Sequence, residues 1–141
     1  MQKIIIDTNV IVSSLIQTSY PYRIVYDLFF EDRISLYIST QLLAEYYEVL
    51  ERPKFYQYHD FCTKAKNVLS NIELKALICE PKTSLNLISD KDDNKILELA
   101  EECEADFIIT GNTNDFSFPN YKHTIIVTPK EYWENYRPME D

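Results

Sequence analysis

Short runs of mainly β-branched residues constrain the fold of this chain most. The first, KIII at 3–6, lacks the alternation of polar and apolar residues that a half-exposed strand shows, so it is predicted to be a buried parallel strand. Further strands are predicted at 35–39, 106–110 and 124–128. Because helical patterns separate these runs, the sequence predicts an α/β domain with a mainly parallel sheet.

Helices are expected between and after the strands, and the last of them has the clearest start. In TPKE, Thr128 is expected to cap the helix, Pro129 to open it and Glu131 to complete a capping box. Ser39 or Thr40 is expected to cap an earlier helix. The other predicted helices span 10–17, 21–33, 41–51, roughly 60–78 and 89–105.

Composition limits the type of protein. A length of 141 residues suits one domain, 1–141. The longest apolar runs are far too short to cross a bilayer, and MQKIIID lacks a signal-peptide core, so a cytoplasmic location is expected. The three cysteines are widely spaced, which argues against a disulfide framework or a zinc site and predicts small core residues. The net charge of −9 argues against unaided binding to nucleic acid.

Three acidic residues occupy positions where apolar residues are expected. Asp7 ends the first strand, Glu45 lies on the apolar side of a helix between Leu42 and Val49, and Asp93 is in line with the apolar face of a later helix. Buried carboxylates need a charged partner, hydrogen-bond donors or a metal. Because ligands in parallel sheets bind at the carboxyl ends of the strands, the three acids are predicted to meet there around Mg²⁺ or Mn²⁺.

Each acid also has a simpler interpretation. Asp7 could cap the following helix, and Glu45 could lie at the solvated rim of its helix. Asp93 could be a first-turn acid near a cap at Ser89 or Asp90.

The single glycine of the chain, Gly111, follows a predicted strand in FIITGNTNDF. It is expected to let the backbone turn tightly, while Asp115 or the side-chain oxygen of Asn112 completes the oxygen cluster. The alternative is a plain turn, because glycine and asparagine tolerate positive φ.

Several segments resemble the PIN-domain family, in particular the toxin components of bacterial toxin–antitoxin pairs. The segments are IIIDTNVIVSS, LLAEYYEVLERPKF, SDKDDNKILELAEECEADFIITGNTNDF and the later TPKEYW, and they span nearly the whole chain. The resemblance implies a PIN-like, RNase H-like α/β/α sandwich that carries a divalent-metal endoribonuclease site. It also implies a cognate antitoxin protein and a homodimer or higher homo-oligomer as partners.

The resemblance assigns roles to individual residues. It implies that Asp7, Glu45 and Asp93 are metal ligands. The fourth family position, often Asp, is Asn112 here, so either Asp115 replaces it or a second metal binds weakly. Asn9, Thr110 and Asn112 are expected to position groups around the site.

The RNA substrate needs a contact surface on this acidic protein. The segment 51–59, ERPKFYQYH, is a candidate, with Arg52 and Lys54 for phosphates and Phe55, Tyr56 and Tyr58 for stacking. A second hypothesis is a catalytically weakened PIN scaffold that binds RNA or protein without cleavage, because Asn112 replaces an acid.

Overall fold

Six strands form one sheet in the computed structural model, which describes residues 1–82, 91–112 and 119–139, without the side chains of 91–93. The strand order is β3-β2-β1-β4-β6-β5, and β5 with β6 is the one antiparallel pair within these ranges. The mainly parallel sheet is therefore confirmed. The strands are β1 (Lys3–Ile6), β2 (Ser35–Ile38), β3 (Leu77–Ile78), β4 (Phe107–Ile109), β5 (Asn120–Tyr121) and β6 (Thr124–Val127).

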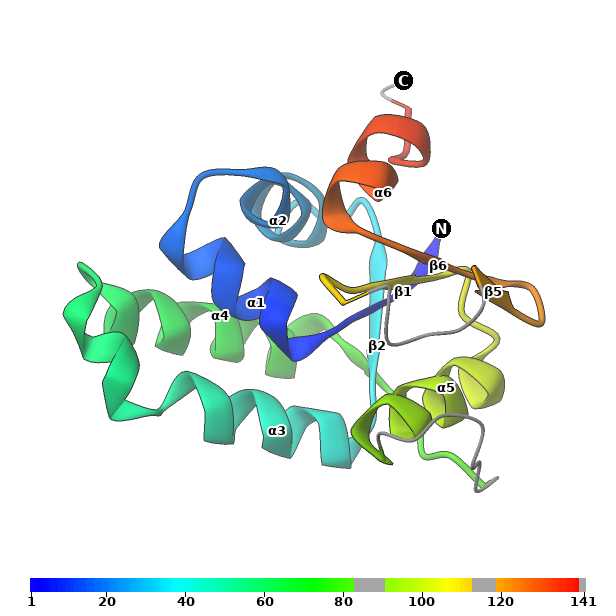
Figure 1. The fold of residues 1–141 in the computed structure, drawn as a ribbon, viewed down its shortest axis with the longest axis horizontal. Coiled ribbons are helices and arrows are strands. Elements are labelled where there is room, and N and C mark those ends of the chain that lie inside the picture. Colours follow the sequence, from blue (N-terminus) through cyan, green and yellow to red (C-terminus); the bar gives the residue numbers. More distant parts are fainter. Residues whose placement is uncertain (83–90, 113–118, 140–141) are drawn as a thin grey trace.

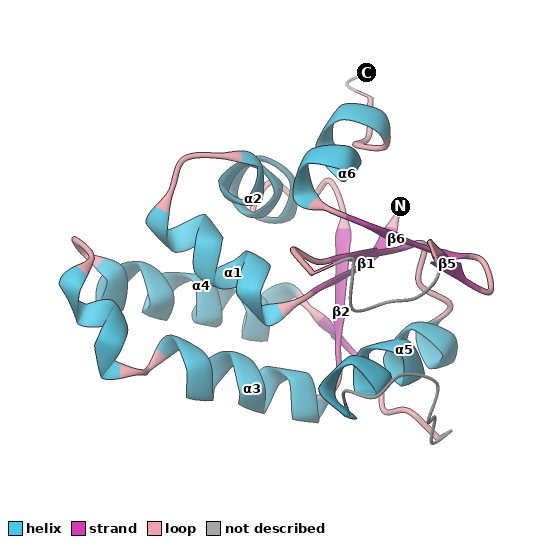
Figure 2. Cartoon of the chain, viewed as in Figure 1, coloured by secondary structure: helices cyan, strands magenta, loops and turns pink. Residues whose placement is uncertain are grey.

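Helices cover this sheet in the arrangement expected for an α/β/α sandwich. In Figure 1, α1 to α4 lie to the left of β2 and α5 lies to its right, and Figure 2 shows the same division by element type. The helices are α1 (Thr8–Ile16), α2 (Tyr20–Arg23), the π-helical η1 (Ile24–Phe29), α3 (Thr40–Leu50), the 3₁₀ turn η2 (Pro53–Gln57), α4 (Phe61–Lys75), α5 (Lys91–Cys103) and α6 (Pro129–Asn135).

The central position of β1 explains its sequence. Ile4 pairs with Leu36 of β2 on one side and with Phe107 of β4 on the other. Ile4, Ile5 and Ile6 are all fully buried, because helices cover both faces of a parallel sheet. Each of these side chains contributes about 1.5–3 kcal/mol through burial.

Two predicted helices differ from the observed ones. The predicted helix 21–33 is divided, because the Phe30 backbone N–H donates to the Val25 carbonyl five residues earlier (2.9 Å), which makes a wide π-type turn. The predicted helix 60–78 ends at Lys75, and the two-residue strand β3 follows. Both β3 and β5 were absent from the prediction, because two residues are too few to show a strand pattern.

The helix caps follow the sequence prediction where they are described. The Ser39 hydroxyl accepts the Leu42 N–H at 3.0 Å and caps α3. At α6, the Thr128 hydroxyl accepts the Glu131 N–H at 3.1 Å and the Glu131 carboxylate accepts the Thr128 N–H at 3.0 Å, which confirms the capping box. The predicted cap of α5 at Ser89 or Asp90 lies outside the described residues.

The three cysteines have different environments. Cys103 is buried, Cys79 is half-buried and Cys62 is exposed, so the prediction of a core position is wrong for Cys62. Its neighbour Phe61 occupies the buried side of α4 and the helical turn directs Cys62 outwards. Burial raises the pKa of Cys103 to about 12, which keeps it a thiol. Within the described ranges, no helix has the length and apolar character needed to cross a bilayer.

Candidate active site

Asp7 lies where β1 ends and α1 begins, at the carboxyl edge of the sheet. Its Oδ1 accepts the Thr8 backbone N–H at 2.8 Å, so Asp7 caps α1 as the simpler interpretation proposed. Its Oδ2 accepts the Thr110 hydroxyl, also at 2.8 Å. Because an ionised carboxylate has about four acceptor sites, capping the helix is compatible with binding a metal ion.

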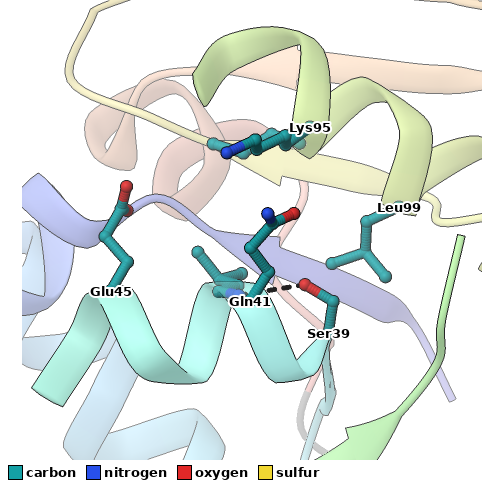
Figure 3. Close-up of a pocket in the computed structure, with 7 residues that line it drawn as sticks. Ser39, Gln41, Glu45, Lys95 and Leu99 are labelled. Carbon is teal, nitrogen blue, oxygen red and sulfur yellow. Dashed lines mark hydrogen bonds between the residues drawn. The ribbon is translucent and has the colours of Figure 1, made fainter. Parts of the chain in front are cut away.

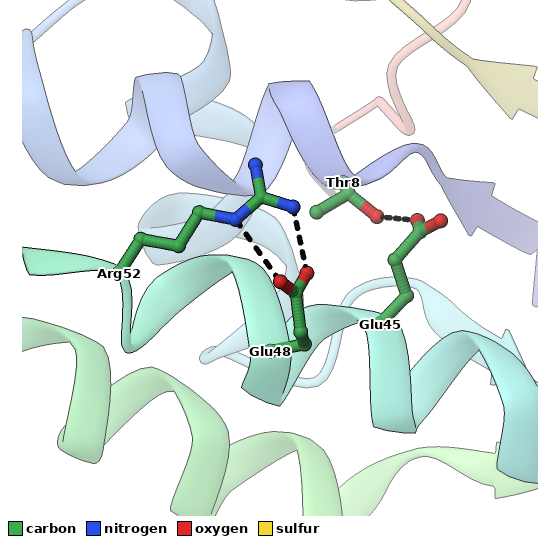
Figure 4. Close-up of polar contacts among 4 residues, drawn as sticks. All are labelled: Thr8, Glu45, Glu48 and Arg52. Atoms are coloured by element: carbon green, nitrogen blue, oxygen red, sulfur yellow. Dashed lines mark hydrogen bonds and ion pairs between the residues drawn. The ribbon is translucent and has the colours of Figure 1, made fainter. Parts of the chain in front are cut away.

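Glu45 is half-buried on α3 and faces the first turn of α1. The Thr8 hydroxyl donates to Glu45 Oε2, as Figure 4 shows. Thr8 itself is buried, with 6% of its surface exposed. One residue therefore connects two acids that are 38 positions apart, through its backbone N–H to Asp7 and through its hydroxyl to Glu45. Thr8 was not among the predicted site residues, although it stands between Asp7 and Asn9 in IIIDTNVIVSS.

Thr110 follows β4, the strand next to β1, and ties the glycine loop to Asp7. Its side chain is fully buried, and its backbone N–H donates to the Val127 carbonyl of β6 at 2.9 Å. The Thr110 hydroxyl donates to Asp7 and accepts the Asn112 N–H at 3.1 Å. Thr110 therefore fixes both the orientation of the Asp7 carboxylate and the path of the loop.

Gly111 does not serve the purpose that the sequence suggested. Its φ is not positive, so the left-handed conformation invoked for a plain turn is not adopted at Gly111. A Cβ at this position would lie 3.6 Å from Asn9 Oδ1, an ordinary van der Waals distance. The Gly111 N–H donates to the same Asn9 oxygen at 3.4 Å, which brings Asn9 beside the loop.

Tyr46 follows Glu45 on α3 and was not identified from the sequence. It is fully buried, and its hydroxyl donates to the Ile6 carbonyl at the end of β1. Burial raises its pKa well above the ordinary value of 10.0, and the charges of Asp7 and Glu45 raise the pKa further. Tyr46 is therefore a neutral hydrogen-bond donor, and both carboxylates are close enough to influence it.

Replacing Tyr46 by Phe is expected to lower the free energy of unfolding by about 1–2 kcal/mol, because the buried Ile6 carbonyl loses its donor. The raised pKa adds a pH dependence. Above about pH 10 the phenol ionises in the unfolded chain but not in the folded protein, so the wild-type protein loses stability there as pH rises.

Urea denaturation at neutral pH and at several alkaline pH values measures both effects. The variant is expected to lose stability less steeply above about pH 10 than the wild-type protein does. Equal alkaline slopes in the two proteins would contradict this assignment of the Tyr46 pKa.

A small pocket adjoins Glu45 between α3 and α5. Its volume is about 140 Å³. Figure 3 shows Lys95 of α5 extending across the pocket from Glu45 and Gln41 of α3 and from Ser39, the N-cap of α3. Leu42, Ile96 and Leu99 supply the apolar lining. The structure therefore places a cationic side chain beside the acidic site, and Lys95 was not among the predicted site residues.

The remaining predicted ligands are only partly described. Asp93 belongs to the first turn of α5, but its side chain lies outside the description, and Asp115 lies outside the described residues altogether. The inward face predicted for α5 is confirmed for Ile96 and Ala100, which are buried. Among the side chains that the structure describes, no group of three or more His, Cys, Asp or Glu residues is placed to hold a metal ion.

The proposed RNA-contact segment 51–59 divides into core and surface. Phe55 is buried and stacks on Phe61 at a centroid distance of 4.8 Å, so its predicted role in RNA stacking is wrong. Arg52 pairs with Glu48 one turn earlier at 2.7 Å (Figure 4). Tyr56 and Tyr58 are exposed, by 61% and 39%, although the Tyr58 ring centroid lies 6.5 Å from that of Phe55.

The fold is that of an α/β protein. Its acidic site lies at the carboxyl edge of the parallel sheet, where proteins of this class usually bind ligands. Residues 3–114 match the family model described as PIN domain. The chain is also 32% identical over 142 residues to the uncharacterized protein MJ1680 of Methanocaldococcus jannaschii, an alignment that covers 95% of this chain and 91% of that protein. The chain belongs to the PIN domain family. PIN domains are generally nucleases, and they typically use divalent metals.

Proposed function

We propose that this protein is a divalent-metal-dependent endoribonuclease that hydrolyses RNA phosphodiester bonds. The observation that carries the proposal is the pairing of Asp7 and Glu45 through Thr8 at the carboxyl edge of the sheet. Two carboxylates that accept hydrogen bonds from the same residue repel each other, and a cation bound by both offsets that repulsion. Their hard oxygen atoms suit Mg²⁺ or Mn²⁺.

The chain offers a defined set of ligands for such an ion. Asp7 and Glu45 would hold it, and Asp93 and Asp115 are proposed as further ligands. When bound, the ion supplies a water of lowered pKa and positive charge for the phosphate.

The neighbouring residues orient the acids and the substrate. Thr8 and Thr110 hold the Asp7 carboxylate from two directions, so its orientation is fixed before the substrate arrives. Asn9 and Asn112 lie at the same edge and are proposed to contact the RNA backbone. Asn112 is exposed, as a residue that meets the substrate must be.

The proposed biological role is that of the toxin in a toxin–antitoxin pair, with the whole chain acting as one cytoplasmic domain. The sequence resemblance to the toxin branch supports this role. An antitoxin protein and a second copy of the chain are the proposed partners. Exposed apolar side chains support contact with another protein: Leu74 lies near the end of α4, and Leu77 and Ile78 form the edge strand β3.

Calorimetric titration with Mn²⁺, together with an RNA cleavage assay, tests the proposed activity. The purified protein is expected to bind Mn²⁺ in the millimolar range or better and to cut single-stranded RNA internally. Removal of the metal with EDTA is expected to abolish cleavage, and added Mn²⁺ to restore it. Intact metal binding without cleavage of structured or unstructured RNA would overturn the nuclease proposal in favour of the catalytically weakened scaffold.

A further inference from the structure

We infer that the pocket between α3 and α5 is a subsite for one nucleotide of single-stranded RNA, next to the phosphate that is cleaved. In this subsite, Lys95 binds a backbone phosphate and Gln41 contacts the edge of the base. The inference rests on the proposed nuclease function, because Glu45 belongs both to this pocket and to the candidate metal site.

The size of the pocket limits what it can accept. A volume of about 140 Å³ is well below the roughly 300–1,000 Å³ of pockets that enclose drug-sized ligands. It therefore suits a single planar group attached to a chain that continues outside. A nucleobase on an RNA strand is a group of this kind.

The lining matches a base in chemistry as well as in size. Leu42 comes from α3, and Ile96 and Leu99 come from α5, so apolar side chains from two helices can contact the faces of a flat ring. Gln41 carries an amide that both donates and accepts hydrogen bonds, as base edges require. The Ser39 hydroxyl is engaged by the Leu42 N–H at 3.0 Å, which holds this end of the pocket in a fixed shape.

Lys95 is the cationic group of this lining. Residues 83–120 contain nine acids and two lysines, so Lys95 is one of the few cationic groups in a mainly negative part of the sequence. Figure 3 shows that Lys95 crosses the pocket from α5 and directs its ammonium toward the end where the Glu45 carboxylate lies. A phosphate beside Lys95 would therefore lie close to the candidate metal ligands, where its neighbour could be cleaved.

The subsite favours single strands over duplexes. Bases in an RNA helix are stacked and paired, and side chains cannot surround them, whereas an unpaired base can turn into a pocket. Phosphate and base are then recognised separately, by Lys95 and by Gln41 with the apolar lining. The two contacts should respond differently to salt and to base identity.

The phosphate contact is tested by binding of a fluorescein-labelled single-stranded hexaribonucleotide, measured by anisotropy in EDTA so that neither metal nor cleavage contributes. Lys95→Gln is expected to weaken binding about tenfold at low salt, because a charged hydrogen bond is lost. The slope of log affinity against log salt should become shallower by about 0.7, the value for one phosphate contact on a single strand. Lys64→Gln, the same change at an exposed position of α4, should alter neither quantity.

The base contact is tested with Gln41→Leu and oligonucleotides of A, C and U. This variant should bind the three sequences more equally than the wild-type protein and keep the wild-type salt slope. Equal behaviour of Lys95→Gln and Lys64→Gln, or no binding of RNA by the wild-type protein, would overturn the subsite. Metal-dependent cleavage by the wild-type protein would still support the nuclease proposal in those cases. Lys95-dependent RNA binding without any cleavage would overturn the nuclease proposal but retain the pocket as an RNA-binding subsite.

Discussion

Replacing Asp7 by Asn is expected to reduce metal-dependent RNA cleavage at least about 100-fold, because even partners that only orient a metal ligand contribute about 10- to 100-fold. The variant should nevertheless fold. Asn is among the best N-cap residues, and its amide oxygen can still accept the Thr8 N–H. In the wild-type protein the Thr110 hydroxyl donates to the Asp7 carboxylate. In the variant, the NH₂ group of the new side chain can donate to that hydroxyl instead.

Cleavage rates, Mn²⁺ titration and urea denaturation should be measured on the same preparations. Asp27→Asn is a matched control, because Asp27 is exposed on η1 and undergoes the same loss of charge. The Asp7 variant should lose the heat of Mn²⁺ binding and retain cooperative unfolding, whereas the control should resemble the wild-type protein. Cleavage at the wild-type rate by Asp7→Asn would show that this carboxylate is not a required ligand.

Replacing Thr110 by Val is expected to weaken Mn²⁺ binding about 10- to 100-fold without changing any proposed ligand. Valine has nearly the same shape as threonine but lacks the hydroxyl that donates to Asp7 at 2.8 Å and accepts the Asn112 N–H at 3.1 Å. Because Thr110 is fully buried, these lost hydrogen bonds should also lower the free energy of unfolding by about 1–3 kcal/mol.

Thr110→Ser separates the hydroxyl from the packing of the methyl group. It should lose about 1 kcal/mol of stability with the buried methyl, but its Mn²⁺ affinity should remain near the wild-type value. The Mn²⁺ concentration that gives half-maximal cleavage should be higher for Thr110→Val and near the wild-type value for Thr110→Ser. If the Ser and Val variants bind Mn²⁺ equally, the hydrogen bond from Thr110 does not orient Asp7.

The sequence predicted the central elements of the fold because their signals are local. The unbroken isoleucines of β1 reflect burial on both faces of the sheet, and the capping box at Thr128 is made by two residues three positions apart. The two-residue strands β3 and β5 left no pattern to recognise. The π-helical turn at Ile24–Phe29 was also missed, because its residues keep the apolar spacing of an ordinary helix.

The candidate site was predictable only in part, because some of its contacts join residues that are distant in sequence. Asp7 is marked by its position after a strand, and Glu45 by its place on the apolar side of a helix. The contacts of Thr8 and Tyr46 join elements that are distant in sequence, and their residue types are also typical of ordinary helix interiors. The position of Phe55 in the core depends on stacking with Phe61, which a single segment cannot show.

The position of β1 in the middle of the sheet also affects when the candidate site is completed during synthesis. β1 is synthesised before its partner β4 and the Thr110 hydroxyl, which follow about a hundred residues later. Contacts so distant in sequence form late in folding, because the intervening loop must close first. A nascent chain that ends before residue 110 lacks the hydroxyl that orients the Asp7 carboxylate, so the proposed nuclease site would be completed only after Thr110 has been made.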